Sequence, residues 1–271
     1  MPMSTNPSVC CSKHVFDVAR VLCAIWVFCC HSFYPVHEWF GFFSVLVFFF
    51  ISGYGMEVTF ARHRALTRLP RFIAVLLFFA LLYFLVTGDF VYPTAWYILA
   101  YSSVMILYRF FGSSLRVFIP LFLFYLLIYR SFGFHANWWL CPFGFLLGVL
   151  VNRFRYFFSW SFSFICFSFG CLFFVFGDLF FLLLWSPLVL RVVMTFSSLS
   201  FLSSLSLFSP LVFPFFSLHC WFLNFFDATW TLGGSTSPFY AFISFCLSLL
   251  GAAVLYVFVP IFSKKKFWIF Q

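Results

Sequence analysis

Charged side chains are scarce in this chain. Asp, Glu, Lys and Arg make up only 8% of its 271 residues, whereas they make up about 25% of a typical soluble domain. This scarcity excludes an ordinary water-soluble globular fold. Hydrophobic residues account for 65% of the chain, and apolar runs of about 18–22 residues recur along it, close to the length that crosses a bilayer as a helix. The composition therefore predicts a helical membrane protein.

Several other features are missing. The apolar runs do not alternate with polar positions, which excludes the pattern of a transmembrane β-barrel, and the first run lacks the small-residue cleavage site of a secretory signal. The ten cysteines include no CxxC pair, so their spacing indicates neither a disulfide framework nor a zinc site. We expect these cysteines to be small packing residues and expect no metal. The GxSxG, P-loop and HExxH motifs are also absent.

Polar turns divide the apolar sequence into ten expected spans. In order, they cover residues 15–33, 39–60, 71–87, 95–111, 117–130, 137–151, 157–175, 179–197, 207–226 and 239–262. The sequence thus predicts an all-α, polytopic transmembrane helical bundle of about ten spans, formed by residues 1–271 as one membrane-embedded domain. Residues 1–14 and the basic segment 263–271 are expected to be tails.

The positions of the basic residues predict the orientation of the bundle. If the N-terminus is cytoplasmic and the spans alternate, thirteen of the fifteen Lys and Arg fall on the cytoplasmic side. Only Arg130 falls outside, and Arg20 lies within a span. This asymmetry follows the positive-inside rule and places both termini in the cytoplasm. It also explains the net charge of +9 without nucleic acid as a partner.

The first span carries three ionisable residues that are costly in lipid. Arg20 and His31 are eleven positions apart, which is about 16 Å along a helix and within about 20° of the same face. Asp17 precedes Arg20 by three positions and can pair with it. Such intramembrane groups indicate a functional site. The alternative is a snorkelling Asp17–Arg20 pair with His31 at the interface.

The second span ends in small residues and is followed by arginines. Ser52, Gly53 and Tyr54 interrupt a Phe-rich helix, and they either allow close helix packing or let a substrate chain pass the backbone. The loop that follows contains Arg62, Arg64, Arg68 and Arg71. Positive-inside anchoring accounts for one or two of these arginines but not for four within ten residues. Arginine suits phosphate because its planar guanidinium offers a fork of donors. The loop therefore indicates a phosphate-bearing cytosolic ligand. A later GxxxG pattern at Gly144 and Gly148 is typical of helix packing.

These residues together resemble the acyltransferase-3 family of integral membrane proteins. The family's Arg-x10-His pattern in the first helix is met by Arg20 and His31, with Asp17 three residues earlier. Its FFxxSGY-type segment is similar to residues 49–54, and the Arg-x-Arg that follows is met by Arg62 and Arg64. His219 stands near a family Tyr-Leu-x-His segment, although the Tyr is missing here. The specific similarity covers residues 15–71.

The resemblance implies a membrane-bound O-acyltransferase of the bacterial inner membrane. It would move an acyl group, acetyl first of all, from cytosolic acyl-CoA to a hydroxyl of a cell-surface or lipid-linked glycan. His31 would be the general base, and Arg20 would position the thioester or stabilise its oxyanion, with Asp17 orienting Arg20. The loop arginines and residues 52–54 would bind acyl-CoA. Two alternatives remain open: a transporter of a small or lipid-linked solute, and an inactive membrane scaffold.

Overall fold

The computed structural model describes residues 13–32, 38–58, 65–87, 95–132, 137–154, 159–175, 180–225 and 238–258. Within these ranges the regular structure is entirely helical, which confirms the predicted all-α class. The elements are α1 (Lys13–Ser32), α2 (Glu38–Val58), α3 (Ala65–Thr87), α4 (Ala95–Phe111), α5 (Leu115–Ser131), α6 (Asn137–Arg153), α7 (Trp160–Val175), α8 (Phe180–Ser197), the 3₁₀ helix η4 (Ser200–Leu211), α9 (Val212–Phe225) and α10 (Pro238–Phe258).

The expected spans coincide with these helices at most of their ends, and two differ. α3 begins at Ala65, six residues before the expected start, and so includes Arg68 as well as Arg71 at the expected start. Arginine is a good helix former, so the helix continues beyond the apolar run that predicted it. The expected ninth span is divided into two parts: η4 comes first and α9 begins at Val212.

The local chemistry of η4 explains this division. The hydroxyl of Ser206 donates a hydrogen bond to the carbonyl oxygen of Ser203, at 2.8 Å. Such bonds compete with the regular α-helical pattern. Pro210 lies inside the same segment and has no N–H to donate. The Ser-rich sequence therefore forms a tighter helix before the apolar α9 starts.

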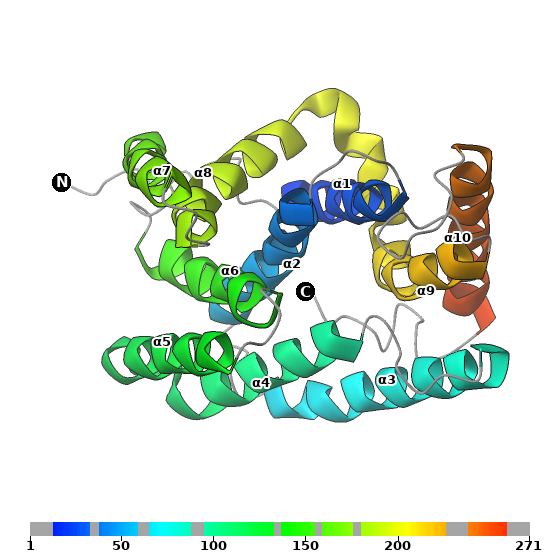
Figure 1. Cartoon of the computed structure of the whole chain (residues 1–271), viewed down its shortest axis with the longest axis horizontal. Helices are drawn as coiled ribbons and strands as arrows, with labels where there is room; N and C mark the ends of the chain where they lie inside the picture. Colours follow the sequence, from blue (N-terminus) through cyan, green and yellow to red (C-terminus); the bar gives the residue numbers. More distant parts are fainter. Residues whose placement is uncertain are drawn as a thin grey trace.

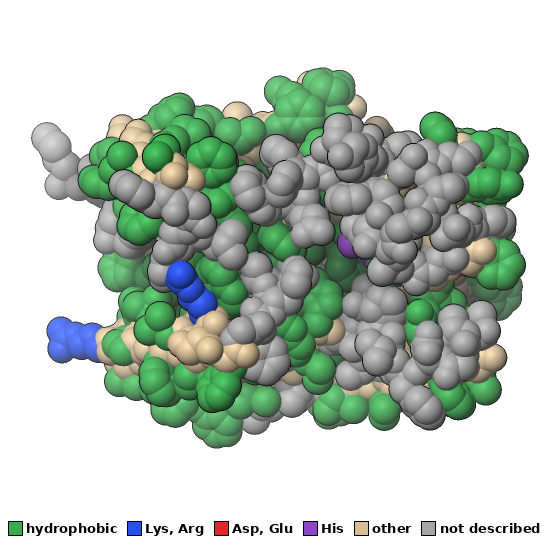
Figure 2. Space-filling view, viewed as in Figure 1, with side chains coloured by type: hydrophobic (Ala, Val, Ile, Leu, Met, Phe, Trp, Pro, Cys, Tyr) green, Lys and Arg blue, Asp and Glu red, His purple; other side chains and the backbone are tan. Residues whose placement is uncertain are grey.

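Three segments of the described chain are long and apolar enough to cross a membrane by themselves. They are Lys13–Ser32, Ser200–Leu223 and Pro238–Phe258. Five further apolar stretches among the described residues have 17 residues or fewer: Gly41–Glu57, Trp96–Phe111, Trp138–Arg153, Trp160–Val175 and Phe181–Ser197. A helix of 17 residues is about 25 Å long, less than the hydrocarbon core of about 30 Å. Hydrophobic side chains nevertheless cover most of the described surface seen in Figure 2, where no acidic side chain is visible. An all-helical, membrane-associated protein fits these observations.

Helices α1 and α2 lie in the middle of the molecule (Figure 1). α3, α4 and α5 line one side of them, α7 and α8 lie at one end, and α9 and α10 lie at the other. α1 packs against α2, η4 and α9, while the main partner of α2 is α6. These central contacts position the polar residues of α1.

The backbones of α2 and α6 are in close contact where the two helices pack together. A Cβ atom added to Gly144 would collide with the carbonyl oxygen of Leu46, and one added to Gly148 would collide with that of Phe50. On the other helix, a Cβ at Gly53 would meet the carbonyl oxygen of Phe145. The residue numbers rise together along both helices, so the two run parallel. The predicted packing role of the GxxxG pattern is confirmed.

Replacement of Gly148 by Ala should destabilise the protein. The new methyl group must push α2 away from α6, and such overpacking typically costs about 1–3 kcal/mol. Gly55→Ala is the matched control, because its Cβ would meet nothing within 4 Å, and alanine is favoured over glycine in a helix by about 0.8–1.0 kcal/mol. Thermal midpoints of both variants in detergent test this. Equal midpoints would contradict the close contact.

Candidate functional site

The N-terminal end of α1 holds a buried ion pair. Nη1 of Arg20 lies 2.8 Å from Oδ1 of Asp17, as the sequence predicted from their spacing, and the two side chains are 7% and 15% exposed. The hydroxyl of Ser209, from η4, donates to the same carboxylate oxygen at 2.9 Å. The opposite charges of the two side chains balance, and the hydrogen bond from Ser209 links the pair to η4.

The surroundings of Arg20 are aromatic. Tyr97 and Tyr101, both from α4, lie near its guanidinium, and both rings lie against Phe49 of α2 at centroid distances of 5.3 and 5.7 Å. A buried charge is tolerated only when it is paired and hydrogen-bonded. Asp17 meets that need within one turn of helix, which explains how α1 can bury an arginine at all.

The C-terminal end of α1 meets α9 through two histidines. The rings of His31 and His219 have centroids 5.4 Å apart. Nδ1 of His219 lies 2.6 Å from the carbonyl oxygen of Phe216, and its Nε2 lies 3.2 Å from Sγ of Cys220. His219 is only 1% exposed. The sequence placed His31 in the site, and the structure adds His219 and Cys220 beside it.

Aromatic rings enclose His219. Phe215 stacks on the imidazole at 6.3 Å with an interplanar angle of 14°, and Phe216 lies at 5.3 Å. Phe28 of α1 approaches from 6.5 Å. These apolar neighbours exclude water, so polar interactions within the pair of histidines are stronger than they would be in solvent.

The small residues of α2 have separate surroundings. The hydroxyl of Ser52 donates to the carbonyl oxygen of Phe48 in its own helix, at 2.9 Å, and the face of Gly53 is occupied by the backbone of α6. The ring of Tyr54 lies edge-on to Phe16 at 5.1 Å. Of this segment, only Gly55 has open space where a side chain would be.

The predicted phosphate-binding arginines lie outside the described residues, or nearly so. Arg62 and Arg64 precede α3 and are not among the described ranges. Arg68 belongs to α3, where only its backbone is described. Their role in binding a donor stays a prediction from the sequence.

A second ion pair was not predicted. Glu57, at the end of α2, accepts hydrogen bonds from Nε and Nη2 of Arg153 in α6, at 2.9 and 2.6 Å, and from the hydroxyl of Tyr108 in α4, at 2.6 Å. Nη2 of Arg153 also donates to the carbonyl oxygen of Gly112. Glu57 is 8% exposed. The sequence did contain a signal for this pair, namely an acidic residue at the end of an apolar helix, because a buried carboxylate requires a cation nearby.

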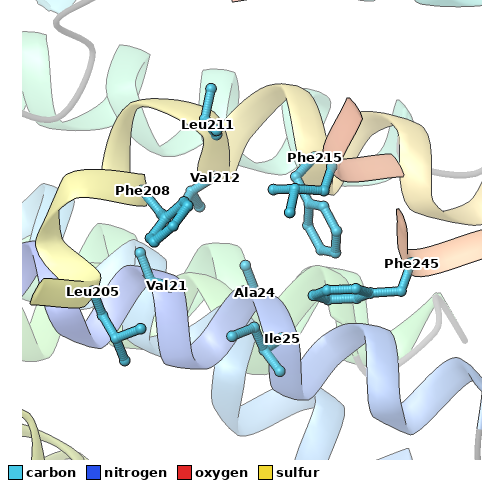
Figure 3. A pocket seen from close by; sticks show the side chains of 10 residues that line it. Val21, Ala24, Ile25, Leu205, Phe208, Leu211, Val212, Phe215 and Phe245 are labelled. Atoms are coloured by element: carbon cyan, nitrogen blue, oxygen red, sulfur yellow. The ribbon is translucent and has the colours of Figure 1, made fainter. Parts of the chain in front are cut away.

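An apolar pocket of about 150 Å³ lies between α1, η4, α9 and α10 (Figure 3). It is lined by aliphatic and phenylalanine side chains, among them Val21, which follows Arg20, and Phe215, which stacks on His219. Such walls offer no partner for phosphate. The pocket therefore suits a hydrocarbon chain and not the nucleotide portion of a coenzyme.

No family model, curated protein or solved structure matches this chain. The resemblance to the acyltransferase-3 family rests on the residue pattern of the first 71 positions. Two features of α1 therefore bear on its function: the buried Asp17–Arg20 pair at one end and His31 beside His219 at the other.

The Glu57–Arg153 pair should contribute measurably to stability. Glu57→Gln removes a charged partner of Arg153 and should lower the thermal midpoint in detergent by the equivalent of about 2 kcal/mol, the usual value of hydrogen bonds to charged groups. Arg153→Gln should do the same, and the double variant should be less destabilised than the sum of both, because they share one interaction. Arg116→Gln, at an exposed arginine, is the control. Additive effects would contradict the pairing.

Proposed function

We propose that this chain is a multi-pass O-acyltransferase of the bacterial inner membrane. It moves an acyl group, acetyl first of all, from cytosolic acyl-CoA to a hydroxyl of an exported or lipid-linked glycan. The observation that carries the proposal is the arrangement of α1, which buries the Asp17–Arg20 pair near one end and holds His31 against His219 near the other. Charged groups inside apolar helices are kept for function in most membrane proteins.

The helix directions support a ten-span topology. Asp17 contacts Ser209 and His31 contacts His219, so α1 runs parallel to the η4–α9 segment. α2 likewise runs parallel to α6. In an alternating bundle of ten spans, the first and ninth cross in the same direction, as do the second and sixth. The packing is thus consistent with alternating spans, and their orientation in the membrane is assigned by the positive-inside rule alone.

The donor would bind at the cytoplasmic side. Arg62, Arg64 and Arg68 would hold the phosphates of acyl-CoA, since guanidinium groups bind phosphate through paired charged hydrogen bonds. The pantetheine arm would pass the open side of Gly55, beside Tyr54. Arg20 lies about 16 Å from His31 along the helix, too far to contact the same reacting atom. Arg20, oriented by Asp17, therefore positions the donor.

His31 would carry out proton transfer at the other end of α1. Neutral imidazole is a suitable base near pH 7. It would accept the proton of the glycan hydroxyl as the oxygen attacks the thioester carbonyl. The C–O bond forms, the C–S bond breaks, and the proton passes to the departing thiolate of coenzyme A. His219 would hold the His31 ring in place, and the apolar pocket would take the hydrocarbon part of a substrate.

Replacement of His31 by Ala should abolish acyl transfer. Loss of a general base typically lowers the rate about 10²–10⁴-fold. The measurement is incorporation of labelled acetyl groups into envelope glycan by cells that produce each variant at equal protein level. His14→Ala, at an exposed histidine of the same helix, is the matched control. Normal acetylation by the His31 variant would refute the assignment.

Purified protein should bind labelled acetyl-CoA. Replacement of both Arg62 and Arg64 by Ala should weaken that binding about a hundredfold or more, because each lost hydrogen bond to phosphate is worth about 1.5–3 kcal/mol. Arg116→Ala should bind normally. A transporter of another solute or an inactive scaffold requires no acetyl-CoA, so absence of binding would favour those two alternatives.

A further inference from the structure

We propose that His31, His219 and Cys220 form a binding site for Zn²⁺. Each residue offers one ligand atom, and the three atoms all lie within 4.8 Å of one another. They come from two helices, α1 and α9, whose residues are remote in sequence. No local spacing such as CxxC can therefore reveal the group, and the absence of a CxxC pair had led us to expect no metal. Among the described residues, no other group of three His, Cys, Asp or Glu side chains is gathered in this way.

The separations are close to those of a bound zinc site. Zinc–nitrogen bonds of about 2.0–2.1 Å and zinc–sulfur bonds of about 2.3 Å place tetrahedral ligand atoms about 3.5 Å apart. Sγ of Cys220 and Nε2 of His219 are already 3.2 Å apart. Only small side-chain rotations are needed to bring the ring of His31 into the same sphere, because its centroid lies 5.4 Å from that of His219.

The hydrogen bonding of His219 prepares it as a ligand. The carbonyl oxygen of Phe216 can only accept, so the contact of 2.6 Å places the ring proton on Nδ1. The lone pair of His219 is then on Nε2, the atom that faces Cys220. Histidines that bind metals almost always donate their other N–H to a carbonyl or carboxylate in this manner. The tautomer and the ring orientation are therefore set before any ion arrives.

The donor set favours zinc over calcium or magnesium. Two imidazole nitrogens and one thiolate are the soft and intermediate ligands that zinc prefers, whereas calcium and magnesium take oxygen. Binding would release the thiol proton of Cys220, and the thiolate would offset part of the charge of the ion. Three protein ligands would leave one coordination position for water or another molecule, as in catalytic zinc sites. Zinc-bound His31 would lack the free lone pair that a general base needs, so a bound ion would block proton transfer at this residue; metal binding itself needs neither donor nor acceptor.

Cobalt provides a direct test, because a Co²⁺–thiolate bond absorbs light by charge transfer. Purified full-length protein in detergent, with reduced cysteines, is titrated with Co²⁺ and then with Zn²⁺. We expect one equivalent of Co²⁺ to produce the thiolate band and Zn²⁺ to abolish it by displacement. Neither donor nor glycan is added, so the outcome is separate from that of the acetylation experiment.

Variants assign the band to these residues. Cys220→Ser keeps the size of the side chain and a group able to donate to His219, so it should fold, yet it should lose the band. His31→Gln should weaken zinc binding by more than the roughly 10–100-fold that loss of an outer hydrogen bond costs. Cys246→Ser, at an exposed cysteine of α10, should match the wild type. No band in the wild type, or the same band in Cys220→Ser, would overturn the proposal.

Discussion

An ionisable side chain that is removed from water must find a partner, and this requirement determines where the helices of this chain meet. Asp17 and Arg20 pair within α1 and are joined by Ser209. Glu57 and Arg153 link α2 to α6, and Tyr108 adds α4. In a chain with so few charges, each such pair fixes the relative position of the elements that it joins. Apolar side chains alone would let these elements slide past one another, because the hydrophobic effect is non-directional.

The apolar contacts follow from these fixed points. α2 and α6 are held together by Glu57 and Arg153 near their ends, and the glycines at positions 53, 144 and 148 let their backbones touch between. Close approach of small residues is a main source of helix association in membranes, where lipid is as apolar as the protein. α1 rests on this pair and carries the polar residues of the candidate site. The closely packed α2–α6 pair thus helps to position Arg20 and His31.

Much of the fold could be predicted because the signals are local. The length of each apolar run predicted nearly every helix, and a spacing of three residues predicted the Asp17–Arg20 pair. The contact of His31 with His219 joins distant helices, so helical phase could only place His31 on a face and could not name its partner. Glu57–Arg153 was missed for the same reason. The 3₁₀ helix η4 was missed because Ser and Pro override a pattern that, by hydrophobicity, is a plain span.

The two ion pairs differ in the time that passes, during synthesis of the chain, between the addition of their first and second residues. Asp17 and Arg20 are three residues apart, so the two charges can pair as soon as the first turns of α1 form. Glu57 precedes Arg153 by 96 positions, and all of α3, α4 and α5 are synthesised in the interval. At about 5–20 residues per second, the carboxylate stays without this arginine for several seconds. The link between α2 and α6 can therefore form only after α6 has been made, which makes it a late contact in the assembly of the helices.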